Sequence, residues 1–279
     1  MAIRFITDSS CDIDVEYATQ NNIVVLPLKI YFGEEEFMDG VDITHEEFFH
    51  RLEHGKILPK TSLVNQYTWE EAFKEAIAAG DQVIAVTISD KLSGTHNAAR
   101  MAKETVGSPD IHLMDSTQVS FSIAALLIEG VKMAKAGKSV EDIYARLDVL
   151  RHKVRIFACI NSLRYLKEGG RLSAVAALVG SLVNLKPIVT AKNGVVANVG
   201  KAIGSKKAQM AVMTKLKEED YDEEMPVYFG HTSNKGALSE FIDMVKKNFK
   251  ILGGKIFSIG ATVGTYAGPG AVAIAFFKK

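Results

Sequence analysis

Short strand-like segments alternate with helix-like segments through the first half of the chain, and this alternation restricts the possible folds more than any other feature. The strand-like segments are rich in β-branched side chains and comprise residues 3–10, 81–89 and 110–116. Helical periodicity fills the intervals, and two helices are expected to begin with a Thr-x-x-Glu capping box, at residues 44–47 and 68–71. The pattern predicts an α/β domain with a largely parallel sheet flanked by helices.

The second half of the chain has a different pattern, and we expect a domain boundary near its start. Residues 186–202 favour two strands joined by a hairpin turn, and residues 172–185 favour a buried apolar helix that is too short to cross a membrane. The glycine-rich residues 264–270 are expected to form a tight connection between strands. These features predict an α/β domain at residues 1–155 and an α+β domain at residues 156–279.

The charge and cysteine content of the chain disfavour several classes of partner. Lysine and arginine total 33, as do aspartate and glutamate, so the net charge of zero indicates no basic surface for nucleic acid or an anionic membrane. Cys11 and Cys159 form no C-x-x-C motif, and the amino terminus does not resemble a secretion signal. We therefore expect a cytoplasmic protein with no nucleic-acid partner and no integral membrane segment.

The stretch DKLSGTHNAAR, residues 90–100, lies where a strand-like run gives way to a helix-like one. Three roles are open for Ser93: a nucleophile, a helix cap, or part of a site for an anion. The G-x-S-x-G elbow of serine hydrolases is not present, which disfavours the first role. Unpaired N–H groups at a helix start attract a carboxylate or phosphate, and Thr61 and Ser62 place further hydroxyls before another expected helix. An anion site is therefore favoured.

Two other candidate sites have simpler explanations. His50 and His54 are one helical turn apart and could share a metal ion, but no third ligand has matching spacing, so a solvated helix face is favoured. Residues 264–270 precede a strand-like run, whereas a dinucleotide-binding glycine loop opens a helix. The sequence predicts no metal site, no cofactor and no catalytic residue.

Six motifs in register along the chain resemble those of the DegV family. They are TDSSCDI at 7–13, KTS at 60–62, SGT at 93–95, LRYLKEGGRLS at 163–173, LVNLKPIVT at 182–190 and GTYAGPGA at 264–271. Each motif alone is weak, but their order and spacing match along essentially the whole chain. The resemblance implies a two-domain protein that holds one long-chain fatty acid, such as palmitate, between its domains. Two interpretations are open for the apolar residues 121–130 and 174–185: walls for the acyl chain, or ordinary core helices.

The resemblance also implies which residues bind the ligand and what the protein does. The fatty-acid carboxylate is expected near Thr61 and Ser93, with Ser62, Gly94 and Thr95 as their immediate support. The implied role is lipid transport or a step of fatty-acid metabolism. In several members of the family the bound acid is presented to a separate kinase that makes acyl phosphate, so a fatty-acid kinase subunit is a second expected partner.

Two positions depart from the pattern of the kinase-serving members. Tyr266 stands where those members have histidine, and Ile203 stands where they tend to have arginine, whereas Arg171 is kept. Binding of a fatty acid is therefore better supported than its phosphorylation. The alternative is an enzyme that acts on a small anion by acyl or phosphoryl transfer through Ser93 or Arg171, although the sequence offers no convincing base, metal set or nucleotide loop for it.

Overall fold

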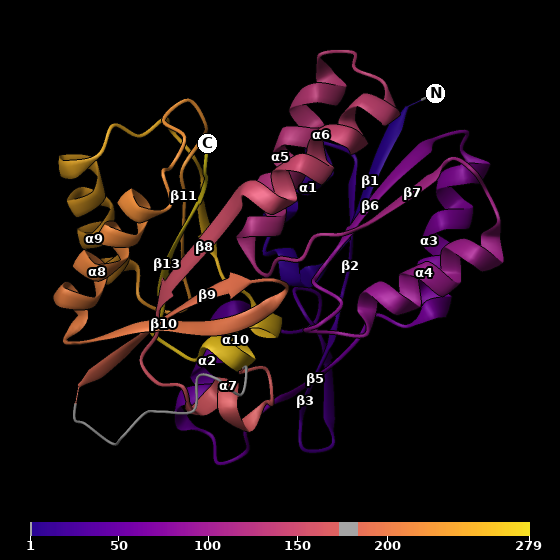
Figure 1. The fold of residues 1–279 in the computed structure, drawn as a ribbon. Coiled ribbons are helices and arrows are strands. Elements are labelled where there is room, and N and C mark those ends of the chain that lie inside the picture. Colours follow the sequence, from indigo (N-terminus) through magenta and orange to yellow (C-terminus); the bar gives the residue numbers. More distant parts are fainter. Residues whose placement is uncertain (1, 173–183) are drawn as a thin grey trace.

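The computed structural model describes residues 2–172 and 184–279, and its first sheet has four parallel strands. In spatial order they are β2 (Ile23–Leu26), β1 (Ile3–Asp8), β6 (Gln82–Thr87) and β7 (Ile111–Asp115). Because the strands run in one direction, their carboxyl ends meet at the same edge of the sheet. The predicted parallel sheet with flanking helices is confirmed (Figure 1).

Helices cover both faces of this sheet. They are α1 (Val15–Gln20), α3 (Gln66–Ala78), α4 (Thr95–Val106), α5 (Phe121–Lys135) and α6 (Val140–Lys153). Side chains alternate along β1, so Phe5 packs in one hydrophobic cluster with Phe121 of α5. Its neighbour Ile6 packs on the other face, with Trp69 of α3. Burial on both faces explains why the strands are almost continuously apolar. A 3-10 helix, η1 (Ser9–Cys11), follows β1.

A smaller antiparallel sheet positions Thr61. Its strands in spatial order are β4 (Glu35–Met38), β3 (Lys29–Phe32) and β5 (Lys60–Ser62). Helix α2 (His45–His54) packs against it, with Phe48 in one cluster with Ile30 and Phe32. Thr61 lies opposite Ile30 in the register of β5 and β3. The backbone of Thr61 is therefore fixed by strand pairing.

The remaining strands form a six-stranded sheet. In spatial order they are β10 (Val195–Ile203), β9 (Leu185–Lys192), β8 (Val154–Cys159), β13 (Val272–Phe277), β11 (Tyr228–His231) and β12 (Ile256–Ser258). Helices α8 (Ser205–Glu218) and α9 (Lys235–Asn248) cover one face, and α5 lies against the other (Figure 1). Asn193 and Gly194 have φ values of 53° and 80°, as the predicted hairpin turn between β9 and β10 requires. The division of the chain at residue 155 remains a prediction.

Two short helices, α7 (Arg164–Glu168) and α10 (Ala261–Ala267), lie close to the smaller sheet. The second of them shows that the prediction of a tight strand-to-strand connection at residues 264–270 is wrong, because part of that segment is helical. Gly264 is needed for helix packing: a Cβ at this position would lie 2.7 Å from Cζ of Phe49. Packing against α2 therefore favours a helix at residues 261–267, although the glycine content of the segment suggested a turn.

The two predicted capping boxes have different outcomes. Glu47 N donates a 3.1 Å hydrogen bond to Thr44 Oγ1, so the predicted N-cap of α2 is confirmed. The prediction for Thr68 is wrong, because α3 begins earlier, at Gln66, and its N-cap is Asn65. Thr68 N donates to Asn65 Oδ1 at 2.9 Å. Asparagine is at least as good an N-cap as threonine, which explains the earlier start.

The predicted apolar helix at residues 172–185, and with it the candidate acyl-chain wall at residues 174–185, falls almost entirely outside the described residues. Within residues 2–172 and 184–279, each helix is too short or too polar to span a lipid bilayer. The chain termini lie on opposite halves of the molecule (Figure 1).

Candidate functional site

Thr61 and Ser93 line one small cavity beside the carboxyl edge of the parallel sheet. Thr61 comes from β5, and Ser93 comes from the loop between β6 and α4. Ser62 and Gly94 line the same cavity. Its wall is completed by Leu28, Leu63, Ile88, Leu92, Arg171, Thr262 and Tyr266. The structure thus brings together four of the five residues predicted for the ligand headgroup, and their role in binding stays a prediction.

The fifth residue, Thr95, supports Ser93 without lining the cavity. Ser93 Oγ lies 2.9 Å from Thr95 Oγ1 and accepts a 3.3 Å hydrogen bond from Thr95 N. Thr95 is buried and is the first residue of α4. Gly94 leaves room for the cavity wall, because a Cβ there would lie 2.8 Å from Leu63 Cδ2. Ser93 is therefore held by another hydroxyl group and by the start of α4.

Tyr266 reaches the cavity from α10. Its hydroxyl oxygen lies 2.6 Å from Thr61 Oγ1, which is a hydrogen bond between segments 205 residues apart. The tyrosine ring rests on Gly169, where a Cβ would lie 2.5 Å from the ring carbons. The guanidinium carbon of Arg171 is 5.2 Å from the ring centroid, within the range of a cation–π contact. Three neighbours therefore fix the position of Tyr266.

Arg171 brings a positive charge to the cavity. Its Nη1 donates a 2.6 Å hydrogen bond to Gly169 O, and its Nε donates to Leu92 O at 3.4 Å. Leu92 directly precedes Ser93, so the arginine is tied to the loop that carries the predicted ligand serine. Arg171 belongs to the LRYLKEGGRLS motif but was not among the residues predicted for the headgroup. Its place at the cavity depends on Leu92 and Tyr266, which lie on distant segments, so the motif alone did not reveal it.

A second, apolar cavity adjoins the first. The two share Ile88, Leu92, Arg171, Thr262 and Tyr266. The other side chains around the apolar cavity are mostly aliphatic. They come largely from β8, β9, β13 and the neighbourhood of α10. The aliphatic ones are Val119, Ile156, Ala158, Ile160, Leu166, Val189, Ala191, Val196, Ile259, Val263, Ala267, Ala271 and Ala273. A polar site that continues into an apolar cavity matches a ligand with one polar end.

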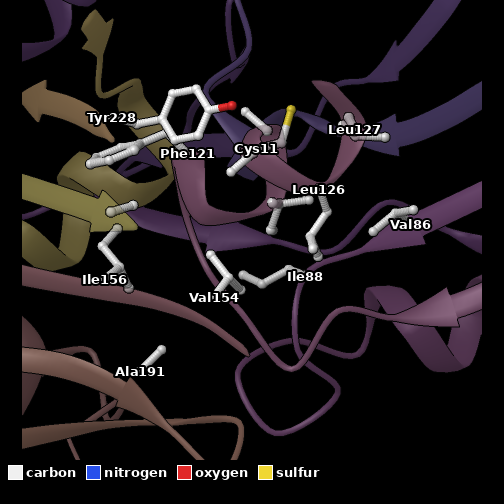
Figure 2. Close-up of a cluster of buried hydrophobic side chains, with 14 of the residues drawn as sticks. Cys11, Val86, Ile88, Phe121, Leu126, Leu127, Val154, Ile156, Ala191 and Tyr228 are labelled. Carbon is white, nitrogen blue, oxygen red and sulfur yellow. The ribbon is translucent and has the colours of Figure 1, made fainter. Parts of the chain in front are cut away.

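The apolar cavity lies between the parallel sheet and the six-stranded sheet. Figure 2 shows Ile88, which follows β6, Ile156 of β8 and Ala191 of β9 facing the same interior region. Residues 121–130 of α5 are not among the side chains around the cavity and pack in the hydrophobic core, which matches the alternative interpretation of this segment as a core helix. Val119 and Ser120, just before α5, line the cavity instead. The helix is apolar on several sides because it is buried between two sheets.

Asp8 fixes the start of the loop that carries Ser93. Its carboxylate accepts hydrogen bonds from Ile88 N at 2.8 Å and from Ser10 N at 3.1 Å, and it also accepts the Ser10 hydroxyl. Burial raises the pKa of Asp8, while the bonds from Ser10 and Ile88 oppose that rise. Asp8, the first aspartate of the TDSSCDI motif, therefore links the end of β1 to the end of β6, beside the cavity.

Within residues 2–172 and 184–279, no three His, Cys, Asp or Glu side chains are placed to share a metal ion. His50 and His54 are exposed on α2 with their rings stacked 4.6 Å apart. His54 Nδ1 lies 2.9 Å from His50 O, which engages one ring nitrogen with the helix itself. This geometry matches a solvated helix face.

The model of the DegV family, described as "Uncharacterised protein, DegV family", matches residues 2–279. The chain belongs to the DegV family. A DegV domain-containing protein of Clostridium perfringens is 31% identical to it over 99% of both chains. One from Caldanaerobacter subterraneus is also 31% identical, again over 99% of both chains.

Solved structures of the DegV family have the same fold. A stearic acid-binding protein from Eubacterium ventriosum is 28% identical, with a TM-score of 0.90 over 100% of this chain and 99% of its own. A DegV protein from Eubacterium eligens, loaded with heptadecanoic acid, is 26% identical with a TM-score of 0.89 over 100% of both chains. DegV of Bacillus subtilis, a fatty acid binding protein, is 27% identical with a TM-score of 0.86, again over 100% of both.

Proposed function

We propose that this DegV protein binds a long-chain fatty acid such as palmitate, with the carboxylate between Thr61 and Ser93 and the acyl chain in the apolar cavity. The observation that carries the proposal is that the hydroxyl-lined cavity beside Arg171 continues into the apolar one. Stearic and heptadecanoic acid in two relatives of the same fold support the ligand class. The cytoplasmic location and a role in lipid transport or fatty-acid metabolism are part of the proposal.

The apolar cavity and the headgroup cavity make different contributions to the binding free energy. Each buried methylene contributes about 0.8 kcal/mol, so the acyl chain supplies most of the affinity. A carboxylate removed from water costs several kcal/mol unless it is hydrogen-bonded. Ser93 can donate such a bond, and so can one hydroxyl of the Thr61–Tyr266 pair while the other donates to its partner. Arg171 adds a favourable charge. The polar end therefore sets the orientation of the ligand.

The alternative, acyl or phosphoryl transfer on a small anion, has less support from the geometry. A nucleophilic serine needs a base within hydrogen-bond reach. Within the described residues, the hydrogen bonds of Ser93 Oγ are those with the hydroxyl and N–H of Thr95. Arg171 lies against Tyr266 and is bonded to backbone carbonyl groups. We therefore propose a binding protein with no catalysis of its own.

We expect the protein to purify with one fatty acid per chain, and native mass spectrometry followed by lipid analysis after denaturation measures this directly. After delipidation, palmitate at a hundred times its Kd should stabilise the protein by about 2.7 kcal/mol, because only the native state binds it. The stabilisation is read as a rise in Tm. Absence of both copurified fatty acid and a Tm shift with palmitate or oleate would disprove the proposed function.

We also propose that the protein can present its fatty acid to a fatty-acid kinase subunit, and we expect slow acyl phosphate formation. A histidine beside the carboxylate could carry a positive charge near neutral pH, which the phenol of Tyr266 cannot do. Tyr266→His should therefore raise turnover roughly tenfold, the effect of about 1.4 kcal/mol of charge assistance. The assay is acyl phosphate production at equal lipid loading.

The matched control for this assay is Tyr67→His, because Tyr67 is 69% exposed on α3. Ile203, at the end of β10, is 59% exposed and occupies the position where arginine was expected in kinase-serving members. If Tyr266→His leaves turnover unchanged, the missing arginine is the limiting departure. Rapid turnover by the unaltered protein would show that neither side chain is needed.

A further inference from the structure

Two buried aspartates from the first 39 residues hold the start of α10. The carboxylate of Asp12 accepts a 2.8 Å hydrogen bond from Gly260 N. The carboxylate of Asp39 accepts bonds of 3.1 Å from Ala261 N and 3.2 Å from Thr262 N. N–H groups at a helix start have no partner inside the helix, so each needs one from elsewhere. The two aspartates supply these partners across more than 220 residues of sequence, with separations of 222 to 248.

Hydroxyl groups hold both carboxylates in turn. Ser9 Oγ donates to Asp39 at 3.0 Å, and Ser120 Oγ donates to Asp12. Asp12 is 8% exposed and Asp39 is 4% exposed, so water does not compete strongly for these bonds. Burial raises the pKa of Asp12 well above its ordinary value, and the bonds from Ser120 and Gly260 oppose that rise. These hydrogen bonds form a network that connects the amino-terminal residues 9–39 and Ser120 to the start of α10.

The backbone at Gly260 lies in close contact with this network. A Cβ at Gly260 would lie 2.9 Å from His45 Nε2 and 3.3 Å from Oδ1 of both Asp12 and Asp39. Any side chain at this position would push the carboxylates away from the N–H groups whose hydrogen bonds they accept. The distance between the aspartates and the start of α10 is therefore narrowly defined.

Helix α10 connects the two aspartates to the headgroup cavity. Thr262 and Tyr266 lie one helical turn apart, so they share a face of α10, and both line the headgroup cavity. Asp39 binds the backbone N–H of Thr262, and the hydroxyl of Tyr266 meets Thr61 at 2.6 Å. The carboxylates at the first turn of α10 therefore hold the helix from which Tyr266 reaches Thr61.

We propose that Asp39, assisted by Asp12, is a positioning residue for carboxylate recognition: it fixes α10 so that the Tyr266 hydroxyl stays beside Thr61, where the ligand headgroup binds. This inference rests on the proposed fatty-acid site and gives a role to Asp12 of the TDSSCDI motif, which the binding residues themselves do not explain. Asp39 acts through Tyr266 and does not line the headgroup cavity.

Asparagine at position 39 is the informative substitution because it keeps the size of the side chain. In the native protein Oδ1 of Asp39 accepts from Ala261 N, while Oδ2 accepts from both Thr262 N and Ser9 Oγ. The amide of asparagine has only one acceptor oxygen, and its NH₂ group would face a donor. The first turn of α10 must then shift, and Tyr266 must move with it.

The test is a double-mutant cycle between Asp39 and Tyr266 that measures headgroup discrimination. Kd values for palmitate and methyl palmitate are measured for the unaltered protein, Asp39→Asn, Tyr266→Phe and the double variant. We expect each single variant to lower the preference for the acid by roughly tenfold, the loss of one hydrogen bond to a charged group. The double variant should lose no more than Tyr266→Phe alone. Asp14→Asn is the control, because Asp14 caps α1 through Tyr17 N and should leave the preference unchanged.

The outcomes separate a positioning role from a merely structural one. A lower Tm in Asp39→Asn with an unchanged preference for the acid would overturn the proposal, and so would independent, multiplicative losses in the double variant. If Asp39→Asn does not fold, Ser9→Ala replaces it in the cycle. It removes the hydroxyl bond to Asp39 Oδ2, the bond that Ser9 Oγ accepts from Leu28 N and the 3.4 Å contact with Thr262 Oγ1.

A second readout needs no ligand and keeps this inference distinct from the proposed function. The ring carbon signal of Tyr266 in ¹³C-tyrosine-labelled protein is identified by its loss in Tyr266→Phe. We expect Asp39→Asn to shift this signal and Asp14→Asn to leave it in place. An unmoved signal in Asp39→Asn would refute the positioning role even if palmitate binds. A protein that binds no fatty acid but shows the shift would refute the proposed function alone.

Discussion

Thr61→Val combined with Ser93→Ala is expected to weaken palmitate binding by a hundredfold or more, while methyl palmitate loses much less affinity. Each substitution removes a hydroxyl that can donate to the carboxylate, and a hydrogen bond to a charged group is worth about 1.5–3 kcal/mol when water cannot replace it. The ester has no charge to stabilise, so its loss is smaller. Isothermal titration of delipidated protein with both ligands measures the difference.

A double substitution away from the cavity provides the control for this experiment. Thr214→Val with Ser239→Ala makes the same chemical changes on the exposed faces of α8 and α9. We expect its affinity for both ligands to match that of the unaltered protein. Equal losses for acid and ester in the Thr61 and Ser93 variant would mean that these hydroxyls do not contact the headgroup.

The sequence named candidate residues for this site, but it could not predict how they are arranged. The motifs that contain Thr61 and Ser93 are short and lie on separate segments, and their common cavity depends on β5 and the β6–α4 loop meeting at one sheet edge. The bond between Tyr266 and Thr61 could not be predicted, since it depends on α10. Helix α10 has no local helix signal because its first N–H groups are capped by Asp12 and Asp39.

The fold shows the same division between local and long-range information. The alternation of strand and helix patterns predicted the parallel sheet, because β1, β6 and β7 are each followed by a segment with helical periodicity. The hairpin of β9 and β10 was predicted, but the place of β13 between β8 and β11 was not predictable, since β13 lies far from both strands in the chain. For α5 the sequence left a cavity wall and a core helix open, because an apolar pattern indicates burial without indicating which segment packs against it.

Ala158→Leu is expected to weaken the binding of both palmitate and its methyl ester by about fiftyfold. Ala158 lines the apolar cavity from β8, beside Ala273 of β13. A leucine side chain adds roughly three carbon groups to the space for the acyl chain, and at about 0.8 kcal/mol per displaced methylene the loss is about 2.4 kcal/mol. Because the added carbons enter a cavity, the free protein should keep its Tm or gain slightly. Titration with both ligands and thermal unfolding without them provide the measurements.

The pattern across ligands distinguishes this effect from the loss of headgroup bonds. Ala158→Leu should reduce acid and ester affinity by the same factor, whereas the Thr61 and Ser93 variant reduces mainly the affinity for the acid. A shorter acid should bind Ala158→Leu with a smaller loss than palmitate does, because fewer of its methylenes compete with the new side chain. Ala145→Leu adds the same carbons on the exposed face of α6 and serves as the control. Unchanged palmitate affinity in Ala158→Leu would place the acyl chain outside this cavity.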